Sequence, residues 1–279
     1  MQIGIFTKIF LRPSLELVLD AVAATGLRCV QFNMESVGLP PMPDALPPGF
    51  AECIRDAAVA RGLILASLQG TFNMSHPDLE ARRAGLRRLR ILIDACPTLR
   101  TSVVAICIGT RDPENMWRHH PDNDTAEAWR DMLSCVREAV RMAEGAGVML
   151  ALEPEVTNLV DSPQKARRLL DEIGSPHLKI TMDAANLFHA GELPRKKEVM
   201  DNAFAQLGRD LVLAHAKDLS RDGEAGQEPA GKGLLDYDHY IALLRGAGFT
   251  GPLLLHGLPE HQVSACVSFL RGKLGNVHA

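Results

Sequence analysis

Four short apolar runs in the second half of the chain each end in a side chain that can bind a metal ion. These side chains are Glu153, Asp183, His215 and His256. Helix-like stretches separate the runs, and parallel strands joined by helices bring their carboxyl ends to one face of a sheet. We therefore expect the four side chains to converge. Two carboxylates and two imidazoles suit one divalent ion such as Mn²⁺, Mg²⁺, Co²⁺ or Zn²⁺.

Three polar residues closely follow these ligands and are candidates for catalysis or substrate binding. Lys217 lies two residues after the third ligand, so it should share that ligand's side of the strand. It either binds a substrate oxygen or is neutralised by a carboxylate of the barrel. Glu155, two residues after the first ligand, is either a proton carrier or the partner of a surface arginine. Asn186, three residues after the second ligand, either binds substrate or caps the turn after its strand.

Other candidates lie further from the four ligands. Gln69 and Asn73 end the third strand-and-helix unit and are candidates for contacts with sugar hydroxyls. His120 and Trp117 lie in the loop after the fourth apolar run, where they can cover a pocket, although Trp117 can equally pack within its own loop. Glu260 stands at the start of the last helical pattern, where it either favours helix initiation or returns a carboxylate to the site.

A recurring glycine marks the points at which helical patterns turn into strand patterns. It occurs at Gly26, Gly62, Gly147 and Gly248, and glycine accepts the left-handed backbone of a helix C-cap. Reading outward from these points predicts strands near residues 2–7, 28–33, 63–69, 102–109, 148–153, 178–183, 211–216 and 252–256. Helices are predicted near residues 14–24, 48–60, 77–94, 125–144, 163–173, 195–207, 237–246 and 259–271. Several strands are nearly continuous in Val, Ile and Leu, as buried parallel strands are.

This alternation predicts one (β/α)8 TIM barrel that occupies residues 1–279 as a single domain. The length of 279 residues fits such a barrel, and 46% hydrophobic residues are enough to fill a large core. An open doubly wound sheet is the competing architecture. The chain lacks a GxGxxG segment after the first strand and a Walker-type loop, and both absences weaken that alternative.

Charge and composition limit the partners and the compartment. The net charge of −4 is unlike that of nucleic-acid-binding proteins, which usually carry a basic patch or stripe. No uncharged apolar run approaches 18 residues, so we expect no membrane span. The first residues lack the features of a secretory signal, and the six cysteines form no CxxC motif. We expect reduced thiols and a cytoplasmic protein.

Four segments carry a resemblance to a known family. They are Leu152-Glu153-Pro154, Met182-Asp183-Ala-Ala-Asn186, His215-Ala-Lys217-Asp218 and Gly251-Pro-Leu-Leu-Leu-His256. With them the chain resembles the sugar phosphate isomerase/epimerase superfamily, the xylose isomerase-like TIM barrels. In that family one divalent metal is bound by a Glu, an Asp, a His and usually a second Glu, after strands five to eight. Glu153, Asp183 and His215 match this set, whereas His256 departs from it.

The resemblance implies a metal-dependent isomerase or epimerase that acts on a small carbohydrate. Glu153, or else Glu155, takes a proton next to a metal-bound carbonyl. Lys217 stabilises the enediolate or anchors the substrate. In the epimerases of this family both Glu ligands move the proton, so His256 puts that two-base mechanism in question. The returning proton then comes from His256 or Glu260.

Three other functions remain as alternatives. One is a dehydratase of the inosose or dehydroshikimate type, which needs the same metal and base but expels a hydroxyl group. Another is phosphoester hydrolysis as in the endonuclease IV branch, which the acidic charge balance and the lack of His after the second and third strands disfavour. The third is a sugar-binding relative without turnover. The sequence leaves open the substrate, the metal and whether the chain forms a homo-oligomer.

Overall fold

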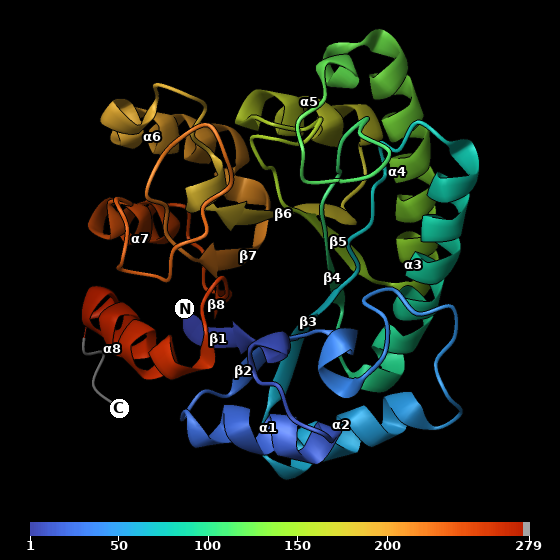
Figure 1. Cartoon of the computed structure of the whole chain (residues 1–279), viewed down its shortest axis with the longest axis vertical. Coiled ribbons are helices and arrows are strands. Elements are labelled where there is room, and N and C mark those ends of the chain that lie inside the picture. Colours follow the sequence, from blue (N-terminus) through green and yellow to red (C-terminus); the bar gives the residue numbers. More distant parts are fainter. Residues whose placement is uncertain (276–279) are drawn as a thin grey trace.

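A closed barrel of eight parallel strands forms the centre of the computed structural model, which describes residues 1–275 (Figure 1). Each strand pairs with the next one in chain order, and β1 pairs with β8 to close the ring. The strands are β1 (Gln2–Phe6), β2 (Cys29–Phe32), β3 (Ile64–Gln69), β4 (Val103–Ile106), β5 (Met149–Leu152), β6 (Leu178–Asp183), β7 (Leu211–Ala216) and β8 (Pro252–Leu255). The predicted TIM barrel is confirmed.

An outer ring of helices surrounds the strands, and Figure 1 shows these helices following one another around the barrel in chain order. The helices are α1 (Leu15–Ala24), α2 (Phe50–Ala60), α3 (Leu79–Leu99), α4 (Ala126–Ala146), α5 (Pro163–Ile173), α6 (Lys196–Leu207), α7 (Tyr237–Gly246) and α8 (Val263–Leu274). Short 3₁₀ turns at Thr7–Ile9, Met34–Val37, Pro121–Asp124, Ala184–Asn186, Leu193–Arg195, Gly208–Asp210 and Glu260–Gln262 lie in the connections.

Local sequence signals set the helix boundaries. Ser162 is the N-cap of α5, where its hydroxyl accepts the Lys165 N–H, and Pro163 occupies the first helical position. Thr125 caps α4 in the same way. The four glycines predicted to end helices all have positive φ, between 63° and 76°, so the predicted helix-to-strand turns are confirmed.

The fourth strand is shorter than the predicted range of 102–109. It leaves the sheet after Ile106, because the residues that follow bond to the loop after β5 instead of to a strand. The Gly109 N–H donates to Asn158 Oδ1 at 2.7 Å, and the Gly109 carbonyl accepts the Leu159 N–H at 2.9 Å. This exchange joins two loops at the carboxyl end of the barrel.

Two helices begin later and end later than their predicted ranges. Helix α3 continues past residue 94 and through Pro97 to Leu99, because Cys96 and Leu99 still belong to its buried apolar face. The gain from this burial outweighs the one backbone hydrogen bond that proline cannot donate. The last helix opens with a 3₁₀ turn at Glu260–Gln262, and α8 then runs to Leu274.

The core has an outer layer between strands and helices and a smaller inner layer inside the barrel. The inner layer contains Phe6, Cys29, Val103, Ala105, Ala151, Leu213 and Leu254. Side chains alternate along a strand, so residues two positions after these point into the barrel as well. Polar residues at such positions therefore meet at the carboxyl end of the cylinder.

None of the helices within residues 1–275 combines the length and the apolar character that crossing a bilayer requires. The six cysteines all lie in this range and are free thiols, five of them buried.

The packing around two glycines, one in the barrel and one on an outer helix, predicts opposite effects of their substitution by alanine. A Cβ added at Gly4 in β1 would lie 2.6 Å from the backbone oxygen of Cys29, which cannot move without shifting β2. We expect Gly4→Ala to lower the free energy of unfolding by about 1–3 kcal/mol. Gly145 is exposed in α4 with open space around it, so Gly145→Ala should raise that free energy by about 0.5–1 kcal/mol. Urea denaturation of both variants measures this, and a Gly4→Ala protein as stable as Gly145→Ala would contradict the assigned packing.

Candidate metal centre

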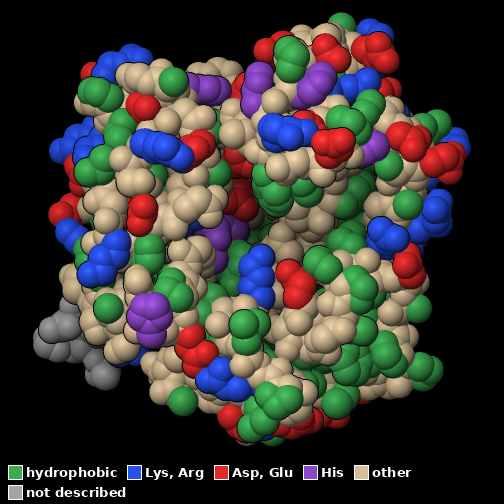
Figure 2. Space-filling view, in the orientation of Figure 1, with side chains coloured by type: hydrophobic (Ala, Val, Ile, Leu, Met, Phe, Trp, Pro, Cys, Tyr) green, Lys and Arg blue, Asp and Glu red, His purple; other side chains and the backbone are tan. Residues whose placement is uncertain are grey.

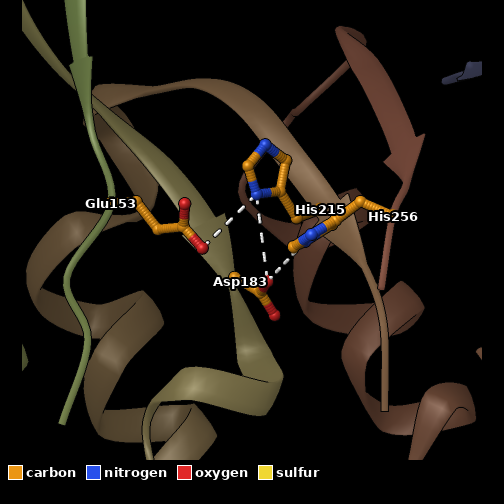
Figure 3. Close-up of side chains that lie close together, drawn as sticks. All are labelled: Glu153, Asp183, His215 and His256. Carbon is orange, nitrogen blue, oxygen red and sulfur yellow. Dashed lines mark hydrogen bonds and ion pairs between the residues drawn. The ribbon is translucent and has the colours of Figure 1, made fainter. Parts of the chain in front are cut away.

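The four potential metal ligands lie together at the carboxyl end of the barrel (Figure 3). Glu153 directly follows β5, Asp183 ends β6, His215 lies in β7 and His256 directly follows β8. One ligand atom from each side chain falls within 4.8 Å of all the others. Asp183 and His215 are buried, whereas the other two are partly exposed to the pocket above them.

His215 and Asp183 form the centre of this group. The Nδ1 atom of His215 lies 3.4 Å from Glu153 Oε1 and 3.8 Å from Asp183 Oδ2. His256 donates its Nε2–H to Asp183 Oδ2 at 2.9 Å, and its ring stacks on Phe6. Oxygen and nitrogen atoms from four strands therefore face one small volume, as Figure 3 shows.

The unpartnered ring nitrogen of His215 is consistent with a cation in this volume. Its Nδ1 is buried and has no hydrogen-bond partner within residues 1–275. Its Nε2 lies 3.4 Å from Gln31 Oε1, an amide oxygen that can only accept, so the contact is favourable when Nε2 carries the proton. In this tautomer of the neutral ring, Nδ1 directs a lone pair toward two carboxylates. Electron-rich atoms held this close at low dielectric repel one another unless a positive charge lies between them.

The surrounding charges keep the ligands in the forms that bind metals. Burial by itself would raise the pKa of Asp183, but Lys217 at 3.6 Å, together with the two imidazoles, holds it well below its usual range. The pKa of Glu153 is also lowered, because His215 and Lys217 outweigh burial and the nearby Asp183. Burial lowers the pKa of His256 to about 4. At neutral pH the carboxylates are thus ionised and His256 is neutral. To bind an ion through Nε2, His256 would carry its single proton on Nδ1 instead of donating it to Asp183.

A pocket of about 430 Å³ opens above the four ligands, within the size range of small-molecule sites. Figure 2 shows it as a hollow at the centre of the face, with acidic and histidine side chains in its depth. Its lining consists of Phe6, Lys8, Gln69, Cys107, Trp117, Glu153, Glu155, Asn186, Lys217, Ala225, Gln227 and His256.

Three of the predicted polar candidates line this pocket, and contacts with neighbouring side chains set the direction of their polar groups. They are Asn186, Lys217 and Gln69. Asn186 donates its amide N–H to Glu153 Oε1 at 2.7 Å, while its Oδ1 is buried without a hydrogen-bond partner in the described chain. Lys217 is 6% exposed and pairs with Asp183. Gln69 is hydrogen-bonded to Gln31. An unpartnered buried amide oxygen and an ammonium in the lining of one pocket suit a ligand with hydroxyl groups.

Glu155 also lines the pocket, but its carboxylate holds the loop after β5. Its Oε1 accepts the backbone N–H of Thr157 at 3.0 Å and the hydroxyl of the same residue. Its Oε2 accepts the Asn158 amide at 2.7 Å. Burial raises the pKa of Glu155 despite these bonds. Its partners are thus loop groups rather than the surface arginine considered from the sequence.

Three other sequence candidates lie outside the pocket lining. Glu260 forms a two-pronged ion pair with Arg12, with one contact of 2.9 Å. His120 caps the 3₁₀ turn at Pro121–Asp124 through its Nδ1 atom. Asn73 accepts the Ser75 N–H at 3.1 Å and thereby shapes the loop after β3. Each of these side chains thus has a hydrogen-bond or ion-pair partner outside the pocket lining.

The sequence analysis did not single out Gln31, Lys8 and Cys107, which the structure places at the site. Lys8 and Cys107 line the pocket, and Gln31 contacts His215 from below. The alternation of side chains along a strand is the sequence pattern that could have identified the strand residues among them. Gln31 and Cys107 each stand two residues after a member of the inner layer and are buried, whereas Lys8 is exposed in the 3₁₀ turn at Thr7–Ile9. A glutamine in a buried strand was the clearest of these signals.

Comparison with known proteins identifies relatives over nearly the whole chain. The family model described as "Xylose isomerase-like TIM barrel" matches residues 19–271. The L-ribulose-5-phosphate 3-epimerase UlaE of Escherichia coli is 26% identical over 184 residues, which are 66% of this chain and 60% of that protein. The alignment therefore covers less than two thirds of the curated relative.

Solved structures share the fold at low sequence identity. A D-psicose 3-epimerase has a TM-score of 0.75 and 15% identity, with 99% of this chain and 100% of that chain covered. AsbF of Bacillus anthracis, described as a probable 3-DHS dehydratase, has a TM-score of 0.74 and 14% identity over 97% of this chain and 98% of its own. At these identities the similarity establishes the fold.

The ligand geometry predicts that a divalent cation stabilises the folded protein. Mn²⁺ at 100 times its dissociation constant should add about 2.7 kcal/mol to the free energy of unfolding. Asp183→Asn should abolish this gain, because it removes the carboxylate that the other groups surround. Thermal unfolding with and without Mn²⁺, Mg²⁺, Co²⁺ and Zn²⁺ measures the effect.

A matched control is Asp201→Asn, which alters an exposed aspartate of α6, in the outer ring of helices, that pairs with His239 at 2.7 Å. This variant should respond to metal as the unmodified protein does. Equal metal responses from Asp183→Asn and Asp201→Asn would rule out a cation at the four ligands.

Proposed function

This chain belongs to the family of xylose isomerase-like TIM barrels, and from this premise we propose that it is a divalent-metal-dependent isomerase or epimerase of a small sugar, sugar phosphate or polyol. The observation that carries the proposal is the position of Glu153. One of its oxygens belongs to the ligand cluster, and its side chain also lines the pocket. The names of UlaE and the D-psicose 3-epimerase support carbohydrate substrates.

Glu153, Asp183, His215 and His256 would hold the ion. When bound, a divalent ion polarises a substrate carbonyl and makes the neighbouring C–H bond more acidic. The rest of the reaction is assigned to side chains of this chain.

Glu153 is the proposed general base. Its Oε1 accepts the Asn186 amide and faces His215, which leaves Oε2 with a single weak contact, 3.7 Å from Cys107 Sγ. The pKa of Glu153 is lowered, so the carboxylate is ionised and ready to accept a proton at neutral pH. The hydrogen bond from Asn186 fixes the carboxylate's direction.

Lys217 and Asn186 are proposed to bind the reacting part of the substrate. The ammonium of Lys217 enters the pocket beside the ligands and can stabilise negative charge on a substrate oxygen. The unpartnered Oδ1 of Asn186 can accept a hydrogen bond from a substrate hydroxyl. Gln69 lines the pocket from the opposite side of the barrel with its amide bound to Gln31 and Thr71, and Trp117 adds an aromatic surface at the rim.

One observation favours a dehydratase as the second candidate function. Of the carboxylates that line the pocket, Glu153 has a free oxygen, whereas Glu155 is bound by three loop groups. The eighth-strand ligand is His256, and Glu260 is paired with Arg12 outside the pocket. Elimination of a hydroxyl needs one base at the acidic C–H bond, as does transfer of a proton on one face of an enediolate. Epimerisation needs proton transfer on both faces.

Exchange of substrate hydrogen with D₂O tests the proposed base. The metal-loaded protein should exchange a C–H next to the carbonyl of its substrate in a panel of ketoses, ketose phosphates and keto-polyols. Glu153→Gln should slow this exchange by about 10²–10⁴-fold, because the amide cannot accept the proton. Mass spectrometry then separates the reactions, since an isomer or epimer keeps the substrate mass and a dehydration product lacks one water.

The exposed Asp201→Asn variant serves as the control and should retain full exchange. Undiminished turnover by Glu153→Gln would remove this residue from the mechanism. Stabilisation by a sugar without hydrogen exchange across the whole panel would instead identify a binding protein that lacks turnover.

A further inference from the structure

We propose that Gln31 is a positioning residue that fixes His215 in the tautomer whose Nδ1 can bind a cation, and that it links this ligand to the pocket through Gln69. The inference rests on the proposed function, because it concerns the cation site of that function. It assigns a role to a residue on the opposite side of the barrel from the four ligands.

The position of Gln31 leaves its side chain no access to solvent. It lies in β2, is 0% exposed and stands two residues after Cys29, a member of the inner layer. Its carboxamide is therefore inside the barrel, beneath the pocket floor. A buried amide must satisfy its hydrogen bonds within the protein, so its contacts determine what it does.

The oxygen end of the Gln31 amide faces His215. Its Oε1 accepts the Ser67 hydroxyl at 3.0 Å and lies 3.4 Å from His215 Nε2. Because an amide oxygen has no proton, this contact favours the proton on Nε2 and leaves Nδ1 bare. Partners of this kind fix the tautomer and ring orientation of metal-binding histidines in proteins.

The nitrogen end of the same amide couples its direction to that of Gln69. Gln31 Nε2 donates to Gln69 Oε1, and Gln69 Nε2 donates to Thr71 Oγ1. If the Gln31 amide flipped, its oxygen would face Gln69 Oε1 and the two oxygens would repel each other, unless the Gln69 amide also flipped. The two amides thus form a directed chain from the pocket wall to the buried side of His215, and a change at Gln69 is transmitted to the imidazole.

Metal affinity tests this role directly. Gln31→Leu removes the acceptor at nearly constant volume and should weaken binding of Mn²⁺ or Zn²⁺ by about 10–100-fold. Gln31→Glu keeps an acceptor in the same place and should restore the affinity, with the Gln69 amide turned so that its N–H faces the new carboxylate. Titration calorimetry gives the dissociation constants, and the absorption spectrum of bound Co²⁺ should change in Gln31→Leu and recover in Gln31→Glu. Gln31→Met replaces the leucine variant if that protein does not fold.

Ser67→Ala is the matched control, because it removes another buried bond to the same oxygen without touching His215. The metal affinity of Ser67→Ala should stay within about two-fold of that of the unmodified protein. This loss is much smaller than the one expected for removing the partner of the histidine itself. Equal affinities for Gln31→Leu and the unmodified protein overturn the inference alone. A loss of metal affinity in Ser67→Ala equal to that in Gln31→Leu also overturns the inference. A failure of Gln31→Glu to restore binding does the same. An unmodified protein that binds none of these metals overturns both the inference and the proposed function.

Discussion

The mutual repulsion of electron-rich atoms is the constraint on which the site depends. Two ionised carboxylates and a bare imidazole nitrogen face each other at the buried end of the barrel, with Lys217 as the nearby positive charge. Folding brings them together because each is fixed to a different strand of a closed sheet. The free energy gained by burying the hydrophobic layers of the barrel holds these groups in place despite their repulsion. A cation bound between them would relieve this repulsion.

The inner layer of the barrel makes this arrangement possible. Small and apolar residues such as Ala151 and Ala105 fill the lower part of the cylinder, and polar residues two positions later occupy the upper part. The change from apolar to polar occurs at about the same height on several strands. Polar groups therefore lie where they can contact one another and the pocket, and few of them are buried among apolar side chains.

The sequence was sufficient to predict the barrel and the convergence of the four candidate ligands, because both follow from local patterns. Each ligand ends an apolar run, and alternation along a strand determines its direction. The contact between Gln31 and His215 could not be predicted, because it joins β2 to β7 across the interior and depends on the stagger of the closed sheet. The engagement of Glu155 and Glu260 depends on loop conformations and on Arg12, which is 248 residues from Glu260 in sequence. Helix α3 passes through Pro97 because buried neighbours outweigh a local rule.

The closure of the ring between β1 and β8 has a consequence for how the protein acquires its site. His256 follows the last strand of the barrel, and that strand pairs with the first one, about 250 positions earlier in the chain. Such distant pairing is entropically expensive and comes late in folding. During synthesis, when amino-terminal segments emerge from the ribosome first, the nascent barrel would hold three ligands beside an open seam. High-affinity capture of an ion would then coincide with the end of barrel assembly.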